Sequence, residues 1–351
     1  MAPPRTSGDG GPVLALFLLA PFVGEFLLGN LTVPELGLGV LLAPLYGCGA
    51  LLVREAARRT GGGWPVIALL AAAYALIEEG PVDQLLWNDS YAGQDLLHGP
   101  SYVPGLGTGV ELVQAVLALH TVWSVCVPIA LVEACVPARR TTPWLGRRGL
   151  VVTAVAYVLG AALVFWGNYA EEHFLASPAQ LALCGAVVVG LVVLALRLAR
   201  RGARPPVAGS APAPWRVGAA ALAGTSLYWG PSVLLTADWF EWIGVALWCA
   251  VAGFGVRAVG RWSRQEGWGA RHVCALAAGA LLTYVRAAFP VRPESGGSLT
   301  ADLVSNAVCG ALALTVLARA VRTARLAESE RPMTPAGPSR SARSGGRSYG
   351  G

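Results

Sequence analysis

Two adjacent glutamates, Glu78 and Glu79, stand inside a long apolar run and are followed directly by Gly80 and Pro81. Carboxylates can bind a cation, exchange a proton or take a proton from water, and an ionised carboxylate inside a membrane is costly unless it has such a partner. Pro81 has no N–H group, so a helix through this stretch must kink or unwind and release a carbonyl oxygen near the glutamates. The stretch therefore indicates a site for a cation or a proton.

Two more acidic residues lie in comparable surroundings. Glu25 follows Gly24 in the first apolar run, and its distance from the start of that run places it at nearly the same depth as Glu78. Broken helices that offer carboxylates and carbonyl oxygens at one depth form the cation sites of many transporters. The predicted cation- or proton-binding residues are Glu25, Glu78, Glu79 and Asp83. The alternative is that these acids contact polar groups of neighbouring helices and that the break only shapes the packing.

A histidine in a later apolar run, His120, adds a nitrogen ligand. On a regular helix His120 and Ser124 share one face, whereas Glu111 points to the opposite side from His120. If His120 meets the glutamate pair, the three side chains could hold a metal ion or supply the base that activates a water molecule. The alternative catalytic set is therefore Glu78, Glu79 and His120. A single histidine in such a position also often does no more than hydrogen-bond to a neighbouring helix.

This combination resembles the CPBP family of intramembrane metalloproteases, the type II CAAX prenyl endopeptidase group. The family's EExxxR motif is matched by Glu78 and Glu79, but Asp83 stands at the arginine position. Its FxxxH motif aligns with Val116 to His120, where Val116 replaces the phenylalanine, and no later apolar run offers a clear second histidine. The resemblance implies metal-dependent peptide cleavage inside the membrane, and the departures leave part of the family's ligand set unmatched.

The elements that must position these residues are ten long apolar runs. Hydrophobic residues make up 55% of the 351-residue chain and charged residues 13%, well below the roughly 25% charged residues of soluble domains. About 20 apolar residues cross a bilayer as a helix, which satisfies every backbone polar group internally. The predicted spans are 12–32, 34–53, 64–86, 108–135, 150–168, 179–197, 214–235, 240–256, 270–288 and 298–320. The fold class is therefore an all-α polytopic transmembrane helix bundle of about ten spans.

The arginines predict how the bundle is oriented. All but two of the 26 basic residues, Arg286 and Arg292, fall before the first span, in alternate connections or after the last span, and the connections between them are acidic. Because basic residues are retained on the cytoplasmic side, both termini are predicted to be cytoplasmic and the protein to lie in the cell (plasma) membrane. We expect a short cytoplasmic N-terminus at 1–11, a transmembrane helical domain at 12–320 and a disordered, Arg-rich cytoplasmic tail at 321–351.

The outer connections contain weaker metal-site patterns. The longest, 87–109, contains Asp95 with His98, and a later outer connection contains Glu172 with His173. His–acid pairs this close in sequence often arise by chance. These pairs are therefore loose metal-binding hypotheses.

Several other features predict no chemistry. Glu133 lies at the cytoplasmic end of its span near Arg139 and Arg140, which is typical of an interfacial charge. The seven cysteines are odd in number, contain no CxxC pair and mostly fall in apolar runs, so they indicate neither a disulfide framework nor a zinc ribbon. The net charge of +6 is spread over short connections, which excludes nucleic acid as an expected partner.

The expected partners are the lipid bilayer and a small cation or small-molecule substrate. Three classes of function stay open: a cation- or proton-coupled transporter, an intramembrane metal-dependent hydrolase, and a non-catalytic scaffold or sensor. The spatial placement of the acids separates them. Convergence around a wet cavity favours transport, convergence on His120 favours hydrolysis, and dispersal favours the scaffold.

Overall fold

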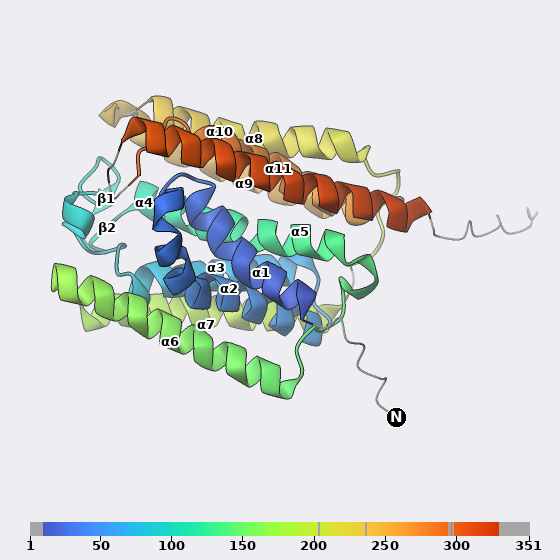
Figure 1. The fold of residues 1–351 in the computed structure, drawn as a ribbon, viewed down its shortest axis with the longest axis horizontal. Helices are drawn as coiled ribbons and strands as arrows, with labels where there is room; N and C mark the ends of the chain where they lie inside the picture. Colours follow the sequence, from blue (N-terminus) through green and yellow to red (C-terminus); the bar gives the residue numbers. More distant parts are fainter. Residues whose placement is uncertain (1–9, 203, 236, 294–295, 297, 330–351) are drawn as a thin grey trace, which may run out of the picture.

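The computed structural model describes residues 10–202, 204–235, 237–293, 296 and 298–329. Its regular structure is helical except for a short antiparallel hairpin of β1 (Tyr102–Val103) and β2 (Thr108–Gly109) within this described part (Figure 1). The α-helices are α1 Gly11–Pro21, α2 Leu36–Arg59, α3 Trp64–Ile77, α4 Val110–Ala118, α5 Val127–Cys135, α6 Arg147–Glu172, α7 Pro178–Arg201, α8 Pro214–Leu234, α9 Asp238–Trp262, α10 Ala270–Ala287 and α11 Leu299–Ser329. Short 3-10 turns are η2 Val33–Glu35, η4 Tyr91–Gly93 and η6 Pro137–Arg139.

Three of the helices continue into π-helical segments. The segment η1 (Phe22–Phe26) extends α1, η3 (Glu78–Val82) extends α3, and η5 (Leu119–Cys126) joins α4 to α5. A π-turn widens the helix because each N–H bonds to the carbonyl five residues earlier, and such segments occur frequently at functional sites. All three lie in the part of the bundle where α1, α2, α3 and the α4–η5–α5 segment pack together.

The helices run along one common axis (Figure 1). Helices α1 to α5 form the middle of the molecule, α6 and α7 lie on one side, and α8 to α11 lie on the other. The most extensive contacts are those of α10 with α8, α3 with α7 and α2 with α6. The start of α1 and the end of α11 lie at the same end of the bundle, and the β1–β2 hairpin lies at the opposite end (Figure 1).

Seven described helical segments are long and apolar enough to cross a membrane, and the α1–η1 segment is apolar but shorter. Helices α6, α7 and α9 have only 11%, 11% and 6% of their apolar windows buried inside the protein. Apolar helices that remain this exposed are expected where lipid surrounds the bundle. The helical membrane fold is therefore confirmed, whereas the count of ten spans and the orientation stay predictions.

Close helix contacts depend on glycines. A Cβ at Gly279 of α10 would lie 2.6 Å from the backbone of α8, and one at Gly47 of α2 would lie 2.2 Å from the carbonyl oxygen of Phe17. Small residues at such crossings let helix backbones approach closely in membranes. Nearby, the rings of Trp123 and Tyr284 stack with their centroids 4.4 Å apart, which fills the space between η5 and α10.

Some predicted boundaries differ from the structure. The helix of the first span ends at Phe26 and that of the third at Val82, earlier than expected, and the chain then turns through Gly29 and Gln84, which have φ of 94° and 64°. Helix α11 continues past residue 320 to Ser329, so the first part of the predicted disordered tail is helical. Residues 1–9 and 330–351 of the predicted terminal segments lie outside the described residues.

Candidate functional site

The π-helical segments carry four ionisable residues that meet inside the bundle. Glu25 lies in η1, Glu78 and Glu79 lie in η3, and His120 lies in η5. In η3 the amide of Asp83 donates to the carbonyl oxygen of Glu78 at 2.7 Å, five residues back, which is the π pattern. The helix thus widens at the proline that the sequence predicted to break it.

His120 meets both glutamates. Its Nε2 lies 2.6 Å from Glu79 Oε1 and 2.9 Å from Glu78 Oε2, and the three residues are only 3–4% exposed. Adjacent residues on a regular α-helix project about 100° apart, so both could face one point only if the Gly-Pro break turned them inward. The π-turn brings both carboxylates to one nitrogen.

The cluster has more acceptors than donors. A ring nitrogen carries at most one hydrogen, and the hydrogen bond of His120 Nε2 goes to Glu79 Oε1. Glu78 Oε2 and Glu79 Oε2 are buried and accept no hydrogen bond within the described part of the structure. Buried acceptors without a donor are destabilising, by about 1–3 kcal/mol each and more when charged. A bound cation would remove this cost.

The three side chains of the cluster offer ligand atoms that suit a metal ion. Glu78, Glu79 and His120 each offer one ligand atom, and these atoms lie within 4.8 Å of one another. Imidazole nitrogen and carboxylate oxygen bind Zn²⁺ at about 2.0–2.2 Å, so three such atoms can surround one ion after small side-chain movements. This is the one group of three potential ligands found among the described residues.

The second ring nitrogen of His120, Nδ1, also has a partner. Ser124 Oγ lies 3.3 Å from His120 Nδ1, which confirms that these two residues share a helix face. A hydroxyl can donate or accept, so Ser124 suits either tautomer of the ring. The rings of Tyr46 and Tyr74 pack against the imidazole, with centroids 5.6 and 6.4 Å away. These contacts fix the ring and leave Nε2 facing the glutamates.

Glu25 lies beside the cluster but outside the group of three ligands. Its Oε1 accepts a hydrogen bond from the Tyr46 hydroxyl, and its Oε2 accepts one from Asn30 Nδ2 at 3.2 Å. A Cβ at the preceding residue, Gly24, would lie 2.8 Å from Ser124 Oγ, so the two segments are in direct contact. Tyr46 was not predicted to belong to the site. Its signal in the sequence is a polar ring in the middle of an apolar run.

Asp83 has different partners. The hydroxyl of Tyr91 donates to Asp83 Oδ1 and Oδ2 at 2.9 and 3.0 Å, and Asn168 Nδ2 donates to Oδ1. These contacts tie the end of η3 to the 87–109 connection and to α6. The structure therefore brings Glu25, Glu78, Glu79 and His120 together and places Asp83 next to this group, toward the hairpin end.

Glu133 was predicted to be an interfacial charge beside Arg139 and Arg140 with no special role, and the structure gives it other partners. It is 5% exposed, and its two oxygens lie 3.0 Å from Arg54 Nε and 2.6 Å from Arg58 Nη2. The prediction was wrong because it compared Glu133 only with the arginines that follow it along the chain. Arg54 and Arg58 lie one turn apart on the same face of α2, which is the signal that could have identified the pairing.

Arg54 lies at the same end of the bundle as Glu133 and contacts several segments there. It is fully buried, pairs with Glu55 Oε1 at 3.0 Å, and its Cζ lies 3.3 Å above the ring of Trp144. Its Nη2 donates to the carbonyl oxygens of Arg139, Arg140 and Thr142 at 3.3, 3.1 and 3.0 Å. Because all three guanidinium nitrogens of Arg54 donate hydrogen bonds, this cluster has a structural role in holding the connection between α5 and α6.

Among the residues that the structure describes, the two predicted His–acid pairs gain no further ligands. Asp95 and His98 contact each other at 2.9 Å, and the hydrogen bond from His98 lowers the pKa of the exposed Asp95 carboxyl. Glu172 Oε1 accepts a hydrogen bond from the amide of Ala92 at 2.8 Å, so Glu172 anchors the 87–109 connection.

The fold and the buried cluster define a helical membrane protein with an ionisable site inside its bundle. The chain belongs to an uncharacterized membrane protein family, whose model matches residues 14–336. No curated protein matches the chain, and no solved structure matches it. A reaction must therefore be argued from the site itself.

Proposed function

We propose that this protein is an intramembrane metal-dependent hydrolase whose metal ligands are Glu78, Glu79 and His120. The observation that carries the proposal is the convergence of both glutamates on one buried imidazole nitrogen, with two carboxylate oxygens left without donors. A divalent ion compensates these negative charges. When bound in a site with an open position, such an ion lowers the pKa of a water molecule and polarises a carbonyl group.

The chain supplies the other parts of a hydrolytic site. Ser124 and the tyrosine rings orient His120, as outer contacts do for metal-bound histidines. Glu25 interacts electrostatically with Glu78 and His120 and is oriented by Tyr46. We assign Glu25 as the group that accepts a proton from the attacking water, because both its oxygens are held by side chains and none is needed as a ligand. The peptide bond as substrate follows from the resemblance to the CPBP family.

The proposal is tested by a search for cleavage products. Membranes from cells that express the protein would be compared with membranes carrying Glu79→Gln, by labelling new protein N-termini and identifying them by mass spectrometry. We expect products that disappear in Glu79→Gln and His120→Ala, disappear with a membrane-permeant chelator, and return with added metal. Glu25→Gln should keep the metal and lose the products. Products that persist in both ligand variants would overturn the assignment.

A second function is proton- or cation-coupled transport. It is supported by four acidic side chains that lie close enough to one another to interact electrostatically. Asp83 follows η3 directly and interacts electrostatically with Glu78 and Glu79, and Glu25 interacts electrostatically with Glu78 and His120. In vesicles, Glu79→Gln should then abolish coupled uptake. The control is Glu171→Gln, because Glu171 is exposed whereas Glu172 anchors a connection. Equal uptake by both variants for every cation tested would remove this candidate.

For the membrane arrangement we propose ten spans with both termini cytoplasmic in the cell membrane. The arginine asymmetry supports this orientation. The location of both described chain ends at one end of the bundle is consistent with an even number of crossings (Figure 1).

A further inference from the structure

A cavity lies beside α4, the helix that leads into η5. It has a volume of about 150 Å³ and is lined from three helices, α4, α8 and α9. Glu111 contributes to it, in agreement with the prediction that Glu111 and His120 face opposite sides of their helix. None of its lining residues belongs to the proposed metal site, so the cavity requires its own explanation.

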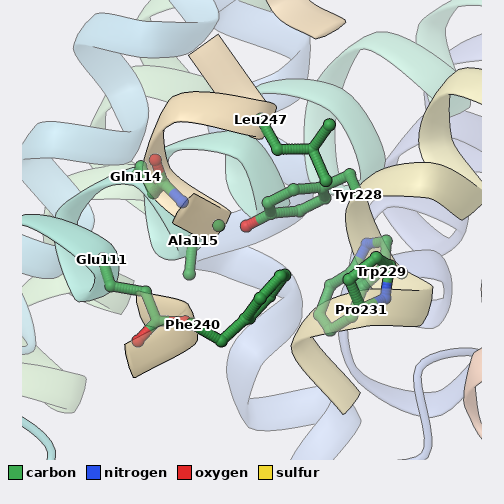
Figure 2. Close-up of a pocket in the computed structure, with 9 residues that line it drawn as sticks. Glu111, Gln114, Ala115, Tyr228, Trp229, Pro231, Phe240 and Leu247 are labelled. Carbon is green, nitrogen blue, oxygen red and sulfur yellow. The ribbon is translucent and has the colours of Figure 1, made fainter. Parts of the chain in front are cut away.

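The wall of this cavity is aromatic. Tyr228 and Trp229 come from α8, and Phe240 comes from α9. Figure 2 shows the hydroxyl end of Tyr228 pointing toward Gln114, and the Phe240 ring lying between Glu111 and the Trp229–Pro231 pair. The faces of aromatic rings carry partial negative charge and attract cations, most strongly when water is excluded.

The charged residues at the cavity are acidic. Glu111 supplies a carboxylate, and Glu241 is close enough to Glu111 to interact with it electrostatically. Glu241 is fixed in place by the amide of Ser101, which donates to its Oε1 at 2.7 Å. Of the residues that the structure describes, no arginine or lysine lines the cavity. Two carboxylates therefore act on this small aromatic space without a basic residue in its wall.

Gln114 gives an independent sign of a missing ligand. This residue lines the cavity, is 8% exposed, and its Oε1 is buried without a hydrogen-bond donor among the described residues. Buried amide oxygens are almost always hydrogen-bonded, because an unsatisfied one is destabilising. A ligand that carries a polarised N–H, O–H or N–CH₃ group would satisfy it.

We propose that this cavity binds a small organic ammonium ion, with Glu111 as its counter-ion and Tyr228, Trp229 and Phe240 as its aromatic wall. An engineered apolar cavity of similar size binds benzene, so the ligand has roughly six or seven heavy atoms. Aromatic side chains combined with a carboxylate are the usual recognition elements for such ions. A bare metal ion is disfavoured, because hard cations require several oxygen ligands and most of this wall is carbon.

Radiolabelled choline is a suitable probe, since it has a quaternary ammonium group and the right size. Binding to purified protein in lipid nanodiscs would be measured by scintillation proximity, with 3,3-dimethyl-1-butanol, its uncharged isostere, as competitor. We expect saturable binding that the isostere does not displace. Glu111→Gln should weaken it by about tenfold or more, and Phe240→Leu by roughly threefold or more.

The control variants separate this site from the proposed hydrolase. Glu78→Gln removes a proposed metal ligand and should leave choline binding unchanged, so failure of the hydrolase proposal does not affect this result. Phe240→Leu keeps the test decisive if Glu111→Gln does not fold, as judged by gel filtration. Absence of saturable binding, equal displacement by the uncharged isostere, or unchanged affinity in both cavity variants would overturn the proposal.

Discussion

At the scale of single residues, the sequence predicted the members of the buried cluster but not all of their contacts. Ionisable residues are rare in apolar runs, and this rarity identified Glu78, Glu79 and His120. The pairing of His120 with Ser124 followed from helix geometry alone. The hydrogen bond between Tyr46 and Glu25 could not be predicted, because it joins two helices whose rotation depends on the whole bundle.

The clearest residue-scale prediction concerns Glu133. Glu133→Gln leaves Arg54 and Arg58 buried without their carboxylate partner, and removal of one member of a buried ion pair costs about 3–5 kcal/mol. We expect a marked fall in the midpoint of thermal unfolding of the purified protein in detergent. Arg59→Ala is the matched control, because the Arg59 side chain is 33% exposed and its pair with Glu55 should contribute below about 1 kcal/mol. Equal shifts in the two variants would contradict the structural role of Glu133.

At the scale of elements, the apolar runs predicted where helices lie, and prolines and glycines predicted only some of their irregularities. Pro81 marked the break in the third span, and the structure shows a π-turn there. The π-helical character of η5 had no such signal inside Leu119–Cys126. A widened turn depends on what the helix packs against, and here η5 packs against α3 and η1. Locally the sequence offers only Pro128 after η5, which removes the α-helical donor for the Ser124 carbonyl but does not specify a π-turn.

A substitution at Gly279 would test how closely α8 packs against α10. A Cβ in Gly279→Ala would lie 2.6 Å from Gly218 O and Leu222 N, which are backbone atoms and cannot move aside alone. We expect a loss of about 1–3 kcal/mol in stability, measured by unfolding in detergent. Gly190→Ala in α7 is the control, because nothing lies within 4 Å of its Cβ position. It should be neutral or stabilise by up to about 1 kcal/mol. A neutral Gly279→Ala would show that these helices do not approach so closely.

At the scale of the whole molecule, hydrophobicity and arginine placement were sufficient to predict a helical membrane protein, because a bilayer imposes its own length and charge rules. The association of α8 with α10 and of α3 with α7 was not predictable. Helix partners in a membrane are chosen by shape and small residues, and one sequence does not reveal those choices.

The proposed orientation makes a direct prediction for cysteine labelling. In a background without the seven native cysteines, Asp95→Cys and Glu171→Cys should react with a membrane-impermeant maleimide added to intact cells. Thr141→Cys and Ser263→Cys should react only after permeabilisation. All four positions are exposed in the structure, so accessibility does not depend on unfolding. Reversed or mixed labelling would exclude ten spans with both termini cytoplasmic.

If Glu78, Glu79 and His120 bind one metal ion, elemental analysis of the purified protein will detect that ion. Inductively coupled plasma mass spectrometry of protein purified without chelators should find about one divalent transition-metal ion per chain. The content should fall to near zero in His120→Ala and Glu78→Gln, and stay at the wild-type level in Glu171→Gln. A wild-type protein without stoichiometric metal after incubation with Zn²⁺, or equal metal in His120→Ala and wild type, would contradict the account.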